Sequence, residues 1–144
     1  MKVTIAICDD DINCADLIEN YISEFKNVVA DCDVYSSGEE LIQAYSANTE
    51  RYEVVFLDME MEQLTGIETA KHIRELDEHI IIVFITSHTE YMYESFKCTP
   101  FRFLIKPLDN ITLLQEGGLF MLKQISFTRA ESNTPVLCKI RFNR

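Results

Sequence analysis

Four apolar segments of this 144-residue chain each end in a side chain suited to metal or phosphoryl chemistry. The polar residues that follow the segments are, in chain order, Asp9 with Asp10, Asp58, Thr86 and Lys106. If the segments are strands of one parallel sheet, their carboxyl ends meet at the edge where such sheets bind ligands. We therefore expect three carboxylates, one hydroxyl and one ammonium group to share a pocket.

The charges of that pocket require a cation. Two carboxylates about 4 Å apart repel by about 4 kcal/mol at an effective dielectric constant of about 20, so three do not stay ionised together without a counter-ion. Mg²⁺ fits best, because it takes one or two carboxylates, keeps several waters and bridges to phosphate. Lys106 adds a positive charge for a phosphoryl group, and Thr86 can donate a hydrogen bond to one of its oxygens. Asp58 can then attack phosphorus and form an acyl phosphate.

Each of these residues has a simpler interpretation when it is taken alone. Asp9 and Asp10 can stabilise the amino end of the helix that follows them. Asp58 can be a turn residue, Thr86 a helix cap and Lys106 a solvated lysine. Their occurrence together at four strand ends favours the shared pocket.

Strand-like and helix-like patterns alternate five times along the chain, which is typical of a parallel sheet covered by helices. The patterns predict strands at 3–8, 32–35, 53–57, 80–85 and 101–105, and helices at 12–25, 37–47, 65–76, 89–97 and 109–125. Capping boxes at Ser37–Glu40 and Thr65–Glu68 open two of the helices. The uniformly apolar strands 53–57 and 80–85 are predicted to be central in the sheet. Residues 126–144 change character, and 136–142 forms one further strand pattern.

The composition limits the classes of function. The net charge is −11, and an acidic domain does not bind DNA through its own surface, because affinity for the duplex rests on cationic contacts. The segment 125–144 is basic, with four Lys or Arg and one Glu, but is too short to argue DNA binding. No signal peptide or membrane span is expected, so the predicted location is cytoplasmic with no membrane partner. The five cysteines lack zinc-like spacing and are interpreted as small buried thiols in a reducing compartment.

Over residues 1 to about 125, the chain resembles the receiver (CheY-like) domain of bacterial two-component response regulators. The resemblance is carried by Asp9-Asp10, the segment 56–61 with Gly66 eight residues after Asp58, Thr86-Ser87 and Lys106-Pro107. It implies an α/β fold, namely a single flavodoxin-like, doubly wound domain. Its five-stranded parallel sheet has the strand order 2-1-3-4-5.

The resemblance also implies roles for individual residues. Asp58 accepts a phosphoryl group from a sensor histidine kinase. Asp10 is a direct Mg²⁺ ligand, Asp9 is a second, Asp58 is a third, and the Glu60 backbone carbonyl completes the set. The Lys106-Pro107 peptide bond is cis. The domain is then no enzyme beyond its own phosphorylation and dephosphorylation.

The segment 91–106 resembles the LytTR-type (AgrA-like) branch of response regulators, in which an effector domain binds DNA. That effector is absent here, so any DNA contact requires a domain outside this chain. Residues 126–144 are interpreted as a linker or as the truncated start of such a domain. The resemblance implies that phosphorylation remodels the face of the fourth helix, fifth strand and fifth helix, and that the domain then forms a homodimer.

Two positions depart from the receiver pattern. Glu62 stands where receivers usually have proline, which loosens that loop. Phe103 occupies the aromatic switch position, often tyrosine, and without a hydroxyl it signals only by burying its ring where Thr86 has moved away. His72 and His79 are interpreted as solvated, and solvent is also the favoured place for His88, although a place at the rim of the pocket stays open.

Two other classes of function compete with a receiver. A haloacid-dehalogenase-type, Mg²⁺-dependent phosphatase also uses a strand-end aspartate, a Thr and a Lys. Such enzymes need a further acidic pair after the lysine, where only Asp109 and Glu116 remain, and usually have Thr or Val where this chain has Asn13. A phosphorylation-independent interaction module is disfavoured because all five site residues are present.

Overall fold

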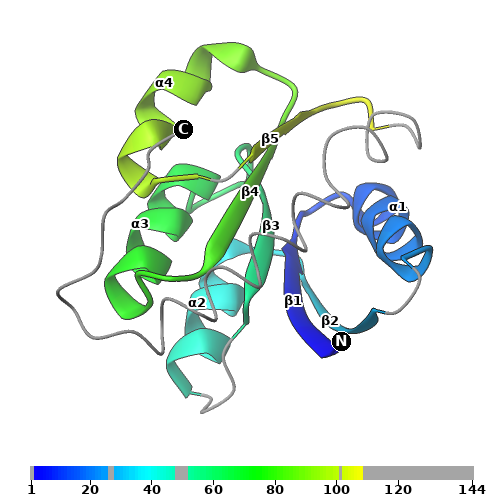
Figure 1. Ribbon diagram of the computed structural model, residues 1–144. Coiled ribbons are helices and arrows are strands. Elements are labelled where there is room, and N and C mark those ends of the chain that lie inside the picture. Colours follow the sequence, from blue (N-terminus) through cyan, green and yellow to red (C-terminus); the bar gives the residue numbers. More distant parts are fainter. Residues whose placement is uncertain (1, 26–27, 48–51, 101, 109–144) are drawn as a thin grey trace, which may run out of the picture.

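The structure is a computed structural model that describes residues 2–25, 28–47, 52–100 and 102–108 (Figure 1). The predicted helix 109–125, the domain boundary near residue 125 and the predicted strand 136–142 lie outside the described residues. Within the described ranges, no helix is long and apolar enough to cross a membrane.

Five parallel strands form one sheet in the order β2-β1-β3-β4-β5, which confirms the predicted fold class and strand order. The strands are β1 Lys2–Cys8, β2 Val29–Tyr35, β3 Val54–Asp58, β4 Ile81–Thr86 and β5 Arg102–Ile105. Every residue of β3 and β4 is buried, as their uniformly apolar sequences predict. The strand β2 begins three residues earlier than predicted, because it pairs with β1 along its whole length at the edge of the sheet.

Helices cover both faces of the sheet (Figure 1). One apolar core lies between α1 (Ile12–Ser23) and one face, and a second lies between the other face and α2 (Gly38–Ala47) with α3 (Gly66–Leu76). Cys8, Cys14 and Cys98 are buried thiols and Cys32 is partly exposed, so the prediction of buried thiols holds for three of the four described cysteines.

The capping predictions are confirmed for one helix and half confirmed for the other. At α3, the Glu68 amide donates to Thr65 Oγ1 at 3.2 Å and the Thr65 amide donates to the Glu68 carboxylate at 2.9 Å. At α2, the Glu40 amide donates to Ser37 Oγ at 3.2 Å. The Glu40 carboxylate, however, accepts from the amide and hydroxyl of Ser36 rather than from Ser37.

The predicted continuous helix 89–97 is instead a succession of three short turns. These are η1 (Thr89–Tyr91, 3₁₀), α4 (Met92–Ser95) and η2 (Phe96–Cys98, 3₁₀), called the α4 segment below. Threonine, tyrosine, phenylalanine, serine and cysteine are poor helix formers, and no side chain caps the segment. It ends at Thr99, whose φ of 48° is left-handed, immediately before Pro100.

Candidate functional site

The register of the sheet brings the predicted carboxylates together. Cys8 pairs with Leu57 and Asp58 pairs with Ile85, so the residue after β1 lies level with the last residue of β3. One carboxylate oxygen from each of Asp9, Asp10 and Asp58 lies within 4.8 Å of the other two. Asp9 and Asp58 are each 2% exposed, whereas Asp10 is exposed at the mouth.

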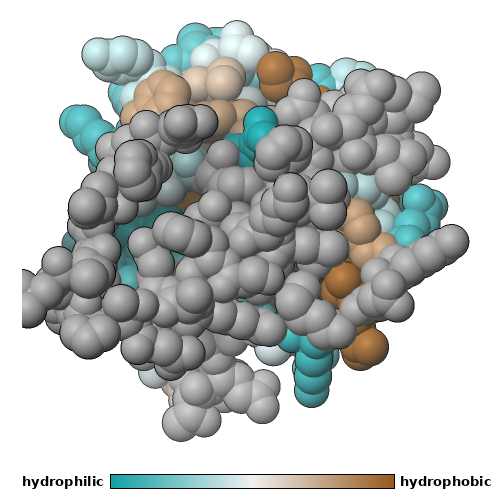
Figure 2. Space-filling model, in the orientation of Figure 1, coloured by the Kyte–Doolittle hydropathy of each residue, from teal (hydrophilic) through white to brown (hydrophobic). Residues whose placement is uncertain are grey.

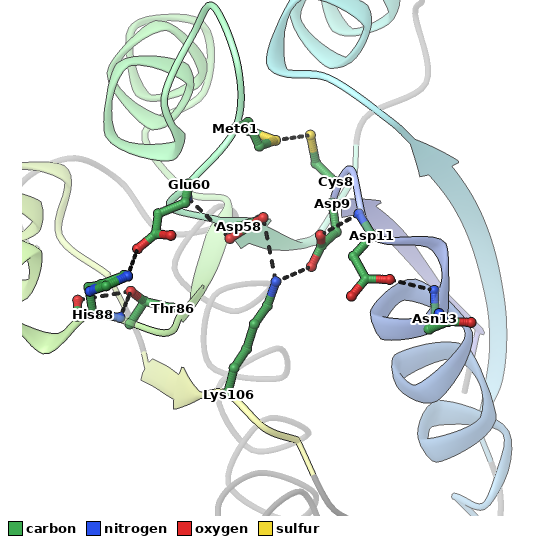
Figure 3. A network of polar contacts seen from close by, with 10 residues as sticks. All are labelled: Cys8, Asp9, Asp11, Asn13, Asp58, Glu60, Met61, Thr86, His88 and Lys106. Carbon is green, nitrogen blue, oxygen red and sulfur yellow. Dashed lines mark hydrogen bonds and ion pairs between the residues drawn. The ribbon is translucent and has the colours of Figure 1, made fainter.

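Lys106 reaches into this acidic cluster from the end of β5 (Figure 3). Its Nζ lies 3.3 Å from Asp9 Oδ2 and 3.6 Å from Asp58 Oδ2. Burial acts to lower the pKa of Lys106, but the two carboxylates outweigh it and raise the pKa above its ordinary value. The Lys106-Pro107 peptide bond is cis, as predicted.

The acidic cluster has more negative charge than Lys106 alone balances. Burial and, after it, the neighbouring Asp9 raise the pKa of Asp58 to about 7, against the opposing effects of the Glu60 amide and Lys106. Asp9 Oδ1 accepts the Asp11 amide at 2.9 Å, but the buried Asp9 Oδ2 accepts no hydrogen bond from the described residues. A buried carboxylate oxygen that has the Lys106 ammonium at 3.3 Å but also faces two more carboxylates still fits a hard divalent cation.

The raised pKa of Asp58 gives a testable dependence of stability on pH. The ordinary value is 3.8 and the folded value about 7, so the folded chain holds this proton more tightly than the unfolded chain. The resulting stabilisation of the folded chain is fully present when the pH is below the ordinary pKa of Asp58, and it is lost as the pH rises through the pKa of the folded chain. Between about pH 5 and pH 8 without divalent cations, we expect the parent to lose roughly 2 to 4 kcal/mol more stability than Asp58→Asn. Urea unfolding at both pH values measures this, and identical pH profiles for the two chains would contradict it.

Glycine at position 66 allows α3 to begin against the backbone of Asp58. The Gly66 amide donates to the Met59 carbonyl at 3.1 Å. A Cβ on Gly66 would lie 2.2 Å from the Asp58 carbonyl oxygen and 2.7 Å from Met59 Cα. The first turn of α3 thus fixes the main chain that carries Asp58.

The loop between β3 and α3 has a support that the sequence did not indicate. The Glu39 carboxylate, from α2, accepts the Leu64 amide at 2.8 Å. Hydrogen bonds from the backbone amides of Glu39 itself and Leu64 lower the pKa of Glu39. This contact holds the loop from outside, beside Gln63 with its left-handed φ of 55°. The loosening expected from Glu62 is therefore opposed by a bond between residues 25 positions apart.

The Thr86 hydroxyl is bonded to the main chain of His88. It donates to the His88 carbonyl and accepts the His88 amide, each at 2.9 Å, and Thr86 is buried. The His88 ring lies beside the pocket, with Nε2 3.2 Å from Glu60 (Figure 3). Its Nδ1 lies 3.2 Å from Glu90. The question left open for His88 is thus answered in favour of the rim. The Glu60 amide in turn donates to Asp58 Oδ1 at 3.1 Å.

Phe103 lies half-buried on β5, the strand that pairs with β4 at the edge of the sheet. Its ring stacks on Phe84 at a centroid distance of 5.8 Å and meets the edge of Phe96 at 5.9 Å. Phe96 itself is 60% exposed. His79 is half-exposed and pairs with Glu78 at 3.3 Å.

Comparison with known proteins identifies the family. The family model for the response regulator receiver domain matches residues 5–117 of this chain. The chain belongs to the response regulator receiver family. Receiver domains are signalling modules rather than classical enzymes, and membership decides against the phosphatase alternative. A sensory transduction protein LytT of Oceanobacillus iheyensis is 31% identical over 109 residues, which cover 74% of this chain and 43% of that protein.

Other relatives agree with the fold and with regulatory roles. The transcriptional regulatory protein RprY of Bacteroides fragilis is 30% identical over 99% of this chain and 59% of its own length. This chain thus spans about half the length of such relatives. A CheY-like receiver domain from Methanospirillum hungatei superposes with a TM-score of 0.74 at 16% identity, covering 91% of this chain and 99% of that one. At that identity the likeness shows the fold alone.

Proposed function

We propose that this domain is a phosphorylation-activated switch that accepts a phosphoryl group on Asp58 from a sensor histidine kinase. The observation that carries the proposal is the buried Asp58 carboxylate, which has Lys106 Nζ at 3.6 Å and two further carboxylates within 4.8 Å. A nucleophile, a cation for the phosphoryl group and an acidic metal cradle are the parts that phosphoryl transfer needs.

Asp9, Asp10 and Asp58, with the backbone carbonyl of Glu60, would hold Mg²⁺. When bound, Mg²⁺ supplies positive charge that stabilises the transferring phosphoryl oxygens. The donor set fits, since all side-chain ligands are carboxylates and one ammonium, that of Lys106, lies among three of them.

The chain's own residues divide the remaining work. An Asp58 carboxylate oxygen attacks phosphorus, the new O–P bond forms, and the N–P bond of the kinase phosphohistidine breaks with its electron pair on nitrogen. The Lys106 ammonium favours the ionised form of Asp58 before transfer and pairs with the phosphoryl oxygens afterwards. The Thr86 hydroxyl donates to one of those oxygens after it leaves His88.

The output of the switch is a change in the face formed by the α4 segment and β5. Movement of Thr86 vacates space into which Phe103 turns. Shifting the equilibrium between the resting and the activated arrangement from 1:99 to 99:1 requires about 5.5 kcal/mol of differential stabilisation. Charge-assisted hydrogen bonds from Lys106 and Thr86, together with the metal, are interactions of sufficient strength.

Acetyl phosphate tests this function without the kinase. Incubated with acetyl phosphate and Mg²⁺, the chain is expected to gain one phosphoryl group, which intact-mass spectrometry detects. Omitting Mg²⁺ is the control and should prevent the gain. A chain that gains nothing from acetyl phosphate or from any phosphorylated sensor kinase would be an interaction module that works without phosphorylation.

Asp10→Asn provides a test of the metal site. Removing one ligand is expected to weaken Mg²⁺ binding by at least about tenfold. The same change removes a repelling carboxylate, so the metal-free variant should unfold at a higher temperature than the parent. Thermal unfolding with chelator and across a Mg²⁺ titration measures both effects. A metal-free variant that is less stable than the parent would contradict the repulsion among these acids.

We further propose that the phosphorylated domain forms a homodimer through the α4 segment and β5. Tyr93 is 85% exposed and Phe96 60% exposed, and aromatic side chains are enriched in interfaces. Figure 2 shows brown apolar surface beside teal polar surface at the top of the view, over the α4 end of Figure 1.

Analytical ultracentrifugation tests the dimer. Beryllofluoride with Mg²⁺, a stable mimic of the phosphoryl group, is expected to shift the chain toward dimer. Arg102→Glu on β5 should reverse the shift, whereas Lys2→Glu, the same charge change at the amino end of β1, should not. A strictly monomeric activated domain would assign this face to another partner.

The relatives of the chain suggest in which larger protein the domain works. We propose that residues 1–125 form the receiver and that 126–144 link it to a LytTR-type DNA-binding effector outside this chain, so that phosphorylation regulates transcription. The LytT and RprY relatives, each about twice as long as the matched region, support this proposal. The cytoplasm is the proposed location of the domain.

A further inference from the structure

We propose that His88 is a positioning residue that holds Thr86 and the amino end of the α4 segment in the resting arrangement. The inference rests on the proposed function, in which the Thr86 hydroxyl must reach a phosphoryl group on Asp58.

The resting arrangement uses the only proton of the Thr86 hydroxyl. That proton is donated to the His88 carbonyl at 2.9 Å, and the same oxygen accepts the His88 amide at 2.9 Å. A hydroxyl has one proton to donate, so Thr86 does not donate to the His88 carbonyl and to a phosphoryl oxygen at the same time. Activation therefore breaks the bond that Thr86 donates to the His88 carbonyl, and any contact that fixes the His88 main chain beside Thr86 opposes activation.

The His88 side chain makes such contacts in two directions, and Figure 3 shows the one toward Glu60. Nε2 lies 3.2 Å from Glu60, in the loop after β3 that begins beside Asp58. Nδ1 lies 3.2 Å from Glu90, in the first turn of the α4 segment, and the ring edge faces Tyr91 at a centroid distance of 6.2 Å. One ring thus ties the phosphoacceptor loop, the residue that holds Thr86 and the start of the α4 segment together.

The two ends of the α4 segment are held by contacts of different strength. At the carboxyl end, Arg74 of α3 donates to the carbonyls of Cys98 at 3.1 Å and Thr99 at 3.3 Å. The same guanidinium donates to the carbonyls of Glu78 and Ile80, each at 2.8 Å, and Cys98 is buried. At the amino end, the His88 ring is 52% exposed and its two partners are also exposed. Release therefore begins at His88, and the segment turns about its anchored end at Cys98 and Thr99.

Exposed ion pairs contribute little, so the expected effect of breaking the His88 contacts is modest. His88→Ala removes the ring and leaves the main-chain bonds to Thr86 in place. It should destabilise the resting arrangement and raise the apparent affinity for beryllofluoride with Mg²⁺ by about two- to fivefold. The midpoint of thermal unfolding without ligand is measured alongside and should stay close to that of the parent.

A second variant separates the tether from simple electrostatics. Glu90→Gln removes the negative charge from one of the two ring contacts, which weakens that contact, and is also expected to tighten beryllofluoride binding. His88→Ala removes a basic group near an anionic ligand and Glu90→Gln removes an acidic one, so charge alone would move the two affinities in opposite directions. His79→Ala is the matched control, because it breaks a similar exposed pair with Glu78 away from the pocket and should leave the affinity unchanged.

Titration of the full 144-residue chain and its variants with beryllofluoride and Mg²⁺, followed by NMR, decides the inference. Tighter binding by both His88→Ala and Glu90→Gln supports the tether. Opposite shifts, unchanged affinities, or an equal shift in His79→Ala would each overturn it. If the parent chain neither binds beryllofluoride nor is labelled by acetyl phosphate, the proposed function itself is wrong. If the parent binds beryllofluoride and the His88 and Glu90 variants bind it with the same affinity, only the tether is wrong.

Discussion

Asp58→Asn is expected to lose all labelling by acetyl phosphate under conditions in which the parent gains one phosphoryl group. The amide of asparagine carries no charge and is a poor nucleophile toward phosphorus, so no acyl phosphate forms. The variant should still fold, because the substitution is close in size and relieves the repulsion that, with burial, raises the pKa of Asp58 to about 7. Intact-mass spectrometry measures the loss, and circular dichroism checks the fold.

Two further variants show whether the loss is specific. Asp31→Asn removes an exposed carboxylate on β2, remote from the pocket in sequence, and should be labelled like the parent. Asp10→Asn should be labelled more slowly at a given Mg²⁺ concentration, but on the same residue, because its carboxylate serves the metal. Labelling of Asp58→Asn as fast as the parent would transfer the nucleophile's role to Asp9 or Asp10 and refute the assignment.

Gly66→Ala is expected to destabilise the fold by about 3 kcal/mol or more, the upper range of the cost of overpacking. The added methyl group would lie 2.2 Å from the Asp58 carbonyl oxygen and 2.7 Å from Met59 Cα. Both are backbone atoms of a buried strand end, so relief requires α3 or the Asp58 main chain to move. Chemical denaturation measures the lost stability, and slower labelling by acetyl phosphate would report the displaced Asp58.

Gly38→Ala is the matched control for that variant. Its methyl group would lie 2.1 Å from the Thr69 Oγ1 atom, which belongs to a side chain. Adding Thr69→Ala should therefore restore most of the stability that Gly38→Ala loses, whereas no side-chain substitution is expected to rescue Gly66→Ala. Equal costs for the two glycine variants without Thr69→Ala would mean that backbone contact at Gly66 is not the decisive feature.

The amino-acid sequence alone was sufficient to predict the sheet and the convergence of the acidic cluster. Strands buried on both faces have continuous apolar sequences, so β3 and β4 were predictable as central. Parallel strands end at one edge, so the residues after four apolar segments had to meet there. For this reason Asp9, Asp10, Asp58 and Lys106 lie together as predicted. Capping by Thr65 was equally local, since its partner Glu68 is three residues away.

Only the tertiary structure decided the features that join residues distant in sequence. The bond from Leu64 to Glu39, the contact of His88 with Glu60 and the four carbonyl contacts of Arg74 depend on how loops and helices pack. The three short turns in place of the predicted helix 89–97 were also not predictable from the pattern. The spacing of apolar residues predicts a helix there, but it does not take into account that the residues of the segment have low helix propensity. Periodicity and spacing report which face of an element is buried, whereas the partner of a polar side chain is chosen by the three-dimensional arrangement of elements around it.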